Sequence, residues 1–245
     1  DAALADGKSV VDGTSTEDVT KVYAALKAAI YNYRLSLASP EEPLELTSNM
    51  LSPGFEDNSK GWVCNGFSPQ SNDAFELKEG TYYCEIWSGW GNVADGDIHQ
   101  IVELPNGNYQ LTVLAQNIQE SNKAIPQKGA YVYANNARKE LSLTGKYTLD
   151  FVVVDNQAKI GVNTIGCTGN KVSIDDFHIY YTGFDDDAQF AEFRQMIQEG
   201  EALLESPQHA DSLAMLAKAV EEAKAVTKTE DIAAKANILR KAITA

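Results

Sequence analysis

The central part of the chain, residues 49–182, alternates between apolar and polar residues over many short segments. The alternation is strongest in the segments 81–87, 97–104, 108–116, 129–134, 147–154, 158–165 and 171–181. Period two is typical of strands, and turn residues such as Asn106-Gly107 separate the segments. Because no helical pattern interrupts them, we predict two packed antiparallel sheets, a β-sandwich of the jelly-roll type.

Helical patterns lie on both sides of this region. Residues 16–38 place one apolar face along a helix, and the segments 187–205, 213–223 and 229–243 do the same near the other end. The chain therefore divides into an N-terminal helix and linker (1–46), a sandwich (47–183) and a C-terminal three-helix segment (184–245). The predicted fold is mainly β with α, in which the N- and C-terminal helices form a small bundle.

The first and last helices resemble each other. TEDVTKVYAALKAAI (16–30) aligns without a gap with TEDIAAKANILRKAI (229–243), with identical Thr, Glu, Asp, Leu, Ala and Ile positions. Two interpretations are open. Short amphipathic helices can match by chance, or the match marks an internal repeat in which the first helix ends one helical module and residues 186–245 form the next.

The net charge of −15 limits the partners of the chain. Nucleic-acid binding depends on Lys and Arg that neutralise phosphates, so we expect no nucleic-acid partner. No apolar run reaches the length of about 20 residues that spans a bilayer, so we expect no membrane insertion within this chain. Neutral glycans, cations and other proteins remain.

Three cysteines, Cys64, Cys84 and Cys167, lack the spacing of a zinc site. They are interpreted as three small buried residues. A Cys64–Cys84 disulfide is the alternative if the two residues lie on adjacent strands.

Acidic residues begin and end the predicted sandwich. Glu56 follows Phe55 in NMLSPGFEDNSKGW (49–62), and Asp175-Asp176 lie in the last strand. The first and last strands of a jelly roll are close together, so these carboxylates would repel each other unless a cation lay between them. Calcium prefers six to eight oxygen ligands at about 2.3–2.6 Å. Alternatively, Glu56 accepts hydrogen bonds from backbone or from Arg or Lys, with no ion.

The motifs SPGFEDNSKGW (52–62), VSIDDFHIYY (172–181) and CEIWSGWGNVADGDIHQIVELPNGNYQLTVLAQN (84–117) resemble secreted carbohydrate-binding modules with a galactose-binding-like β-sandwich. The resemblance covers residues 47–183. It implies a secreted or cell-surface protein with helical spacers, and a structural calcium held by Glu56 and Asp176, with Asp175 as the second choice. Phe55 and Trp62 would be core residues.

A glycine-rich loop within 85–97 carries the best candidates for a sugar site. Trp87 and Trp90 offer flat faces on which the C–H groups of a sugar stack, and Asn92 and Asp95 offer hydroxyl-binding groups. In the alternative interpretation, Trp87 packs in the core and Trp90 fills the loop. Tyr131 and Tyr133 share one face of a strand and are further candidates, although ordinary sheet packing also explains them.

These residues lead to three hypotheses. The first is a non-catalytic carbohydrate-binding or adhesion module whose partner is a glycan. The second is a structural or protein-interaction module that contacts other cell-surface proteins. The third is a glycosidase using two carboxylates, with Glu85 and Asp97 as the pair to test. Nucleophile, metalloprotease and phosphate-loop motifs are missing from the sequence, so we predict that the protein is not an enzyme.

Overall fold

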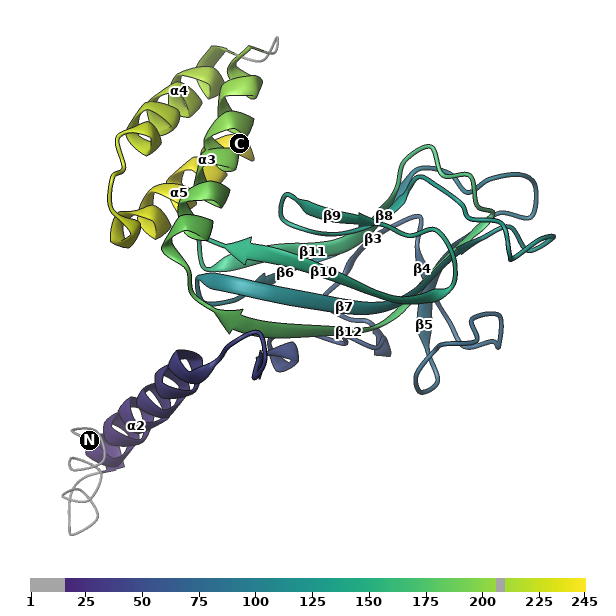
Figure 1. Ribbon diagram of the computed structural model, residues 1–245, viewed down its shortest axis with the longest axis horizontal. Helices are drawn as coiled ribbons and strands as arrows, with labels where there is room; N and C mark the ends of the chain where they lie inside the picture. The colour runs from purple at the N-terminus through teal and green to yellow at the C-terminus, as the bar shows by residue number, and fades with distance from the viewer. Residues whose placement is uncertain (1–15, 206–209) are drawn as a thin grey trace.

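The computed structural model describes residues 16–205 and 210–245, which form a two-sheet β-sandwich with helices at one end (Figure 1). The first sheet, sheet I, has the order β10-β7-β12-β5-β4, and β1 also pairs with β12. Its strands are β1 (Leu44–Glu45), β4 (Ser68–Gln70), β5 (Tyr83–Trp87), β7 (Gly107–Ile118), β10 (Gly145–Val153) and β12 (Lys171–Gly183).

Sheet II has the order β3-β6-β11-β8-β9. Its strands are β3 (Val63–Asn65), β6 (Gly96–Glu103), β8 (Ala130–Ala134), β9 (Ala137–Glu140) and β11 (Gln157–Thr164). All strand pairings of both sheets are antiparallel in the described ranges. The predicted antiparallel sandwich is therefore confirmed, and it is consistent with a jelly roll. The sequence pattern did not predict the short strands β3, β4 and β9, or β2 (Glu56–Ser59).

The core lies between the sheets and includes an aromatic cluster near β2. Phe55, Trp62 and Phe177 are buried, and their ring centroids are 5.0–6.3 Å apart. The indole N–H of Trp62 donates to the carbonyls of Leu51 and Ser52 at 3.1 Å. The prediction that Phe55 and Trp62 are core residues is confirmed. Burial of each large side chain contributes about 1.5–3 kcal/mol.

The C-terminal helices form a bundle with a core of its own. α3 (Asp186–Leu204), α4 (Ala210–Lys224) and α5 (Thr229–Ile243) contact one another. Val154, from the turn between β10 and β11, is buried in this second core and joins the bundle to the sandwich.

The N-terminal helix α2 (Thr16–Leu37) packs differently from our expectation. It contacts β12, and Tyr31 and Leu35 pack against the sandwich core. Figure 1 shows it on the opposite side of the sandwich end from α3, α4 and α5. The bundle is thus made by the C-terminal helices alone. α2 is attached to sheet I instead, because Tyr31 and Leu35 pack against the sandwich core. Residues 1–15 of the expected N-terminal segment lie outside the described residues.

In the part of the chain that the structure describes, no helix combines the length and the apolar character needed to cross a membrane.

Candidate functional site

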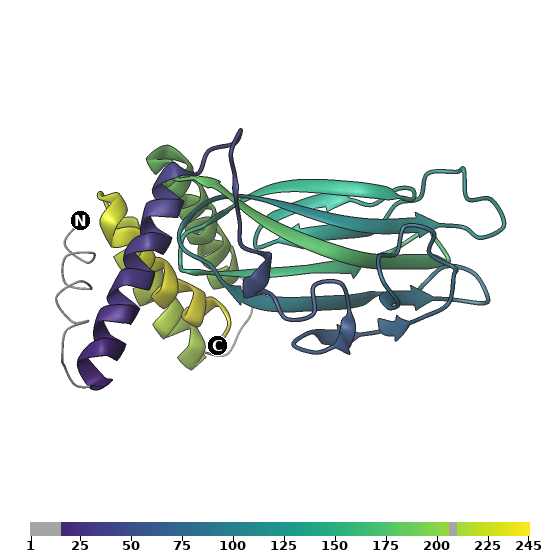
Figure 2. The ribbon, with the colours of Figure 1, turned by 90° about the horizontal axis from the view of Figure 1, so that it is seen from below.

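Trp87 is the last residue of β5, on the outer face of sheet I. The helices gather at one end of the sandwich (Figure 2), and β5 lies toward the other end (Figure 1). Side chains of a strand alternate between its two faces. Cys84 and Ile86 point into the core, so Tyr83, Glu85 and Trp87 point outward. Trp87 is 54% exposed, which excludes the alternative that it packs in the core.

A row of polar residues crosses four strands beside Trp87. Strand pairing places Ser68 opposite Glu85, Glu85 opposite Ser173, and Ser173 opposite Gln116. The Ser173 hydroxyl donates to Glu85 Oε2 at 2.9 Å and accepts from Gln116 Nε2 at 2.8 Å. Because hydrogen bonds link Glu85, Ser173 and Gln116, this part of the row is organised without a ligand.

The polar row opens into a cavity of about 510 Å³. Its lining consists of Gly66, Ser68, Gln70, Asn72, Glu85, Trp87, Glu120 and Lys171. The indole N–H of Trp87 donates to Glu120 Oε2 at 2.9 Å, and the Lys171 ammonium lies 6.0 Å from the centroid of the indole ring. These contacts hold the Trp87 ring in a fixed orientation at the edge of the cavity.

Charges in the cavity are paired. Lys171 Nζ lies 2.5 Å from Glu120 Oε1 and 4.0 Å from Glu85 Oε2. The hydrogen bond from Lys171, with that from Trp87, lowers the pKa of Glu120 below its ordinary value. Burial raises the pKa of Tyr83, so its phenol is neutral and donates to Asn72 Oδ1 at 2.8 Å. The cavity thus offers fixed donors and acceptors and two carboxylates for one ammonium.

The loop between β5 and β6 presents Trp90 to solvent. Trp90 is 96% exposed, so it does not fill the loop as in the alternative interpretation. Asn92 Oδ1 instead accepts from Gln119 Nε2 at 3.1 Å, and Asp95 Oδ1 accepts from the backbone N–H of Gly166 at 2.9 Å. These two side chains therefore hold the loop by hydrogen bonds to the segments around Gln119 and Gly166.

Tyr131 and Tyr133 lie on β8 of sheet II, and the structure does not bring them to Trp87. Arg138 lies over the ring of Tyr131 and Lys159 over the ring of Tyr133, each at 5.7 Å. The Tyr133 hydroxyl donates to Asp97 Oδ1 at 2.7 Å. Both rings are therefore engaged in contacts across the outer face of the second sheet.

Glu85 and Asp97, the pair considered for a glycosidase, are on different sheets. Glu85 is on the outer face of sheet I, whereas Asp97 alternates with the core residue Ile98 and faces outward from sheet II. Packed sheets are about 10 Å apart, and both carboxylates point away from the layer between them. The two groups cannot flank one glycosidic bond, which needs a separation of about 5–9.5 Å.

Glu56 and Asp175 are close to the same loop, residues 79–82, as expected for first and last strands that meet. Glu56 Oε1 accepts from the backbone N–H groups of Thr81 and Tyr82 at 2.7 and 2.8 Å. Asp175 is buried and accepts from Glu79 N and Asp176 N, both at 2.8 Å. Amide donors thus occupy these carboxylates, which is the arrangement of the ion-free alternative.

Asp176 lies at a bulge of β12, with a φ of 52°, and its Oδ1 is 3.0 Å from His178 Nε2. Within residues 16–205 and 210–245 no group of three or more His, Cys, Asp or Glu side chains is arranged to hold a metal. Backbone N–H groups point at Oε1 of Glu56 and at both oxygens of Asp175, so these oxygens have hydrogen-bond partners without an ion. Calcium stays a prediction.

Thermal unfolding distinguishes the predicted calcium site from the ion-free alternative. Since backbone amides satisfy Glu56 and Asp175, we expect the same Tm in excess EGTA and in excess CaCl2, measured by scanning calorimetry. A calcium-dependent rise in Tm that disappears in Glu56→Gln would instead assign the ion to these residues.

The buried carboxyl of Asp175 makes stability depend on pH. Burial, together with repulsion from Asp176 and Glu56, raises its pKa to about 7. The folded state therefore holds this proton more tightly than the unfolded chain, where the pKa is about 3.9. The resulting stabilisation is complete below about pH 4 and is lost as the pH rises to about 7.

We expect Asp175→Asn to remove this contribution. Between about pH 4 and pH 7, the free energy of unfolding of the wild type should fall by roughly 2–4 kcal/mol more than that of the variant. Urea unfolding over a pH series measures the difference, and Asp57→Asn, an exposed carboxyl, is the control. Parallel pH profiles of wild type and Asp175→Asn would contradict the assignment.

The cysteines are free, and only two of them are buried. Cys84 and Cys167 are buried, as interpreted, but Cys64 is exposed. Cys64 is on β3 of sheet II and Cys84 on β5 of sheet I, so they are not on adjacent strands of one sheet.

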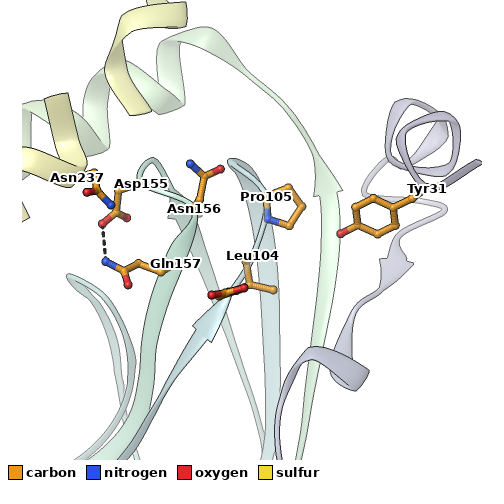
Figure 3. A pocket seen from close by; sticks show the side chains of 8 residues that line it. Tyr31, Leu104, Pro105, Asp155, Asn156, Gln157 and Asn237 are labelled. Atoms are coloured by element: carbon orange, nitrogen blue, oxygen red, sulfur yellow. Dashed lines mark hydrogen bonds between the residues drawn. The ribbon is translucent and has the colours of Figure 1, made fainter. Parts of the chain in front are cut away.

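A second cavity, of about 460 Å³, lies at the helical end, between α2, α5 and two turns of the sandwich (Figure 3). Tyr31 and Asn237 approach it from the helices. Asp155, which points into the junction, is already bound by Arg240 and by Gln157 Nε2. This cavity is a junction between structural units, whereas the cavity at Trp87 combines an exposed aromatic face with several polar groups.

No family model and no curated protein matches the chain. Among solved structures, it is similar to a family 61 carbohydrate-binding module in complex with β-1,4-galactotriose, with 19% identity, a TM-score of 0.44 and coverage of 54% of this chain and 97% of that chain. A xylan-binding domain, CBM22-1 of Paenibacillus barcinonensis Xyn10C, has 12% identity, a TM-score of 0.39 and coverage of 55% and 95%. A Stig cyclase from Fischerella sp. has 12% identity, a TM-score of 0.43 and coverage of 58% and 100%. Likenesses of this degree do not bear on the ligand, which must be inferred from the site itself.

Proposed function

We propose that the protein is a non-catalytic glycan-binding module that binds neutral sugars on the outer face of sheet I. The observation that carries the proposal is the position of Trp87, half exposed and held beside a cavity lined by amide, hydroxyl and carboxylate groups. A sugar ring stacks its C–H face on indole, and polar groups at its edge read the hydroxyls. Trp90, three residues further along the chain and exposed, offers a second aromatic face. Such a role belongs to a secreted or cell-surface protein, and this location is part of the proposal.

Charge supports neutral sugars over acidic ones. The chain has a net charge of −15, and the cavity contains Glu85 and Glu120 against Lys171. Uronic acids and sulfated sugars would meet net repulsion there.

The same charges support binding rather than hydrolysis. A glycosidase needs a carboxylic acid that keeps its proton near neutral pH. The pKa of Glu120 is instead lowered by Lys171. Glu85, the other carboxylate in the cavity, accepts from the Ser173 hydroxyl.

Affinity gels and calorimetry test the proposal with neutral polysaccharides (galactan, xylan, mannan, β-glucan) and with polygalacturonate and heparin as acidic counterparts. We expect retention by at least one neutral polymer, none by the acidic ones, and no release of reducing ends. Failure to bind any neutral polymer, or hydrolysis of the bound one, would contradict the proposal.

A further inference from the structure

The helix α2 carries an apolar stripe that the sandwich does not cover. Its residues recur at intervals of four and three: Val19, Tyr23, Leu26, Ile30, Tyr33 and Leu37. We call this stripe the α2 seam. Five of the six are between 48% and 66% exposed, with Leu26 less so. Alternate spacing of four and three is typical of a helix face that packs along other helices.

The aligned helix α5 shows what covers such a face. In the gapless match, Val19, Tyr23 and Leu26 correspond to Ile232, Ala236 and Leu239. Those residues of α5 are at most 1% exposed, in the core that α5 forms with α3 and α4. The same stripe is therefore buried in one helix and exposed in the other, although the two sequences share their spacing.

We propose that the α2 seam is the docking site of a helical hairpin built like α3–α4, supplied by the same polypeptide ahead of α2, as α3 and α4 precede α5. α2 would then be the last helix of a second three-helix unit.

Charge favours such a hairpin over a second copy of α2. Lys27 and Arg34 flank the seam, and α3 is rich in glutamate: Glu192, Glu199 and Glu201. Two antiparallel copies of α2 that cross near its middle would instead bring the two Lys27 ammonium groups together. Because Tyr23 is larger than its counterpart Ala236, the hairpin needs a smaller residue opposite Tyr23.

Hydrogen exchange provides the test. In the full chain, we expect the amides of α2 to exchange faster than the aligned amides of α5. Residues 1–15 are then replaced by a copy of residues 186–228, which joins the hairpin to Thr16 with the spacing that precedes Thr229. We expect α2 exchange to slow by about tenfold or more, further in Tyr23→Ala, and the slowing to be lost in Leu26→Asp, while exchange in β7 is unchanged.

Unchanged exchange of α2 in the fusion carrying Tyr23→Ala would overturn the proposal. So would concentration-dependent association of the full chain in sedimentation experiments that Ile30→Glu abolishes, because that result assigns the seam to a second copy. Neither readout depends on glycan binding.

Discussion

Trp87→Ala is expected to weaken binding to the neutral glycan by tenfold to a hundredfold, a loss of about 1.5–3 kcal/mol. The ring supplies the flat apolar face at the edge of the cavity, and its indole N–H fixes Glu120. Alanine removes both. Isothermal titration with the best polysaccharide or its oligosaccharides measures the affinity.

Two further variants distinguish a specific loss of glycan binding from a general effect of replacing an aromatic residue. Trp90→Ala should reduce affinity less, since Trp90 lies in the loop outside the cavity lining. Tyr131→Ala, on sheet II, should leave affinity unchanged. Because Trp87 is half exposed, its variant should unfold near the wild-type Tm. Wild-type affinity in Trp87→Ala would contradict the site on sheet I, and a loss of affinity in Tyr131→Ala would place the site on sheet II.

Arg240→Met should destabilise the protein by about 2–4 kcal/mol and separate the unfolding of bundle and sandwich. Arg240 of α5 donates from Nε and Nη2 to Asp155, whose side chain is fully buried at the turn between β10 and β11. Methionine keeps most of the apolar stem but leaves a buried carboxylate with only Gln157 as partner. The lower end of the range reflects the partial exposure of the guanidinium.

Two spectroscopic probes follow the unfolding of this variant in guanidinium chloride. The three tryptophans are all in the sandwich, so fluorescence reports its unfolding, and circular dichroism at helical wavelengths reports the bundle. In the wild type the transitions should coincide. In Arg240→Met the helical transition should come first. Lys241→Met, an exposed neighbour on the same helix, is the control; a midpoint for Arg240→Met equal to this control would show that the pair does not couple the units.

Strand positions were predictable because local alternation determines them. The patterns over 97–104, 108–116 and 171–181 match β6, β7 and β12 within two residues at each end. Short strands such as β3 and β4 have three residues each, too few to show a period. They are held by pairing with a longer strand, which is a tertiary property.

The candidate site shows the same division. Trp87 and Trp90 were found from the local sequence: Trp87 ends a strand pattern, and Trp90 lies between Gly89 and Gly91, where little local structure can bury it. Glu120, Lys171 and Ser68 were missed, since they come from separate segments and meet Trp87 only through strand register and loop packing. Glu85 and Ser173 each lie between two apolar residues of a strand. This alternation predicts that both point out of the sheet, and it could have identified them as site residues.

The sequence by itself determined the strands, the helices and their apolar faces, because these depend on residues close together in the chain. Only the tertiary structure decided which faces are covered. It set Glu85 and Asp97 on opposite sheets, turned backbone amides toward Glu56, and buried Leu239 of α5 while leaving Ile30 of α2 exposed. Burial depends on distant partners, and a local pattern does not specify them.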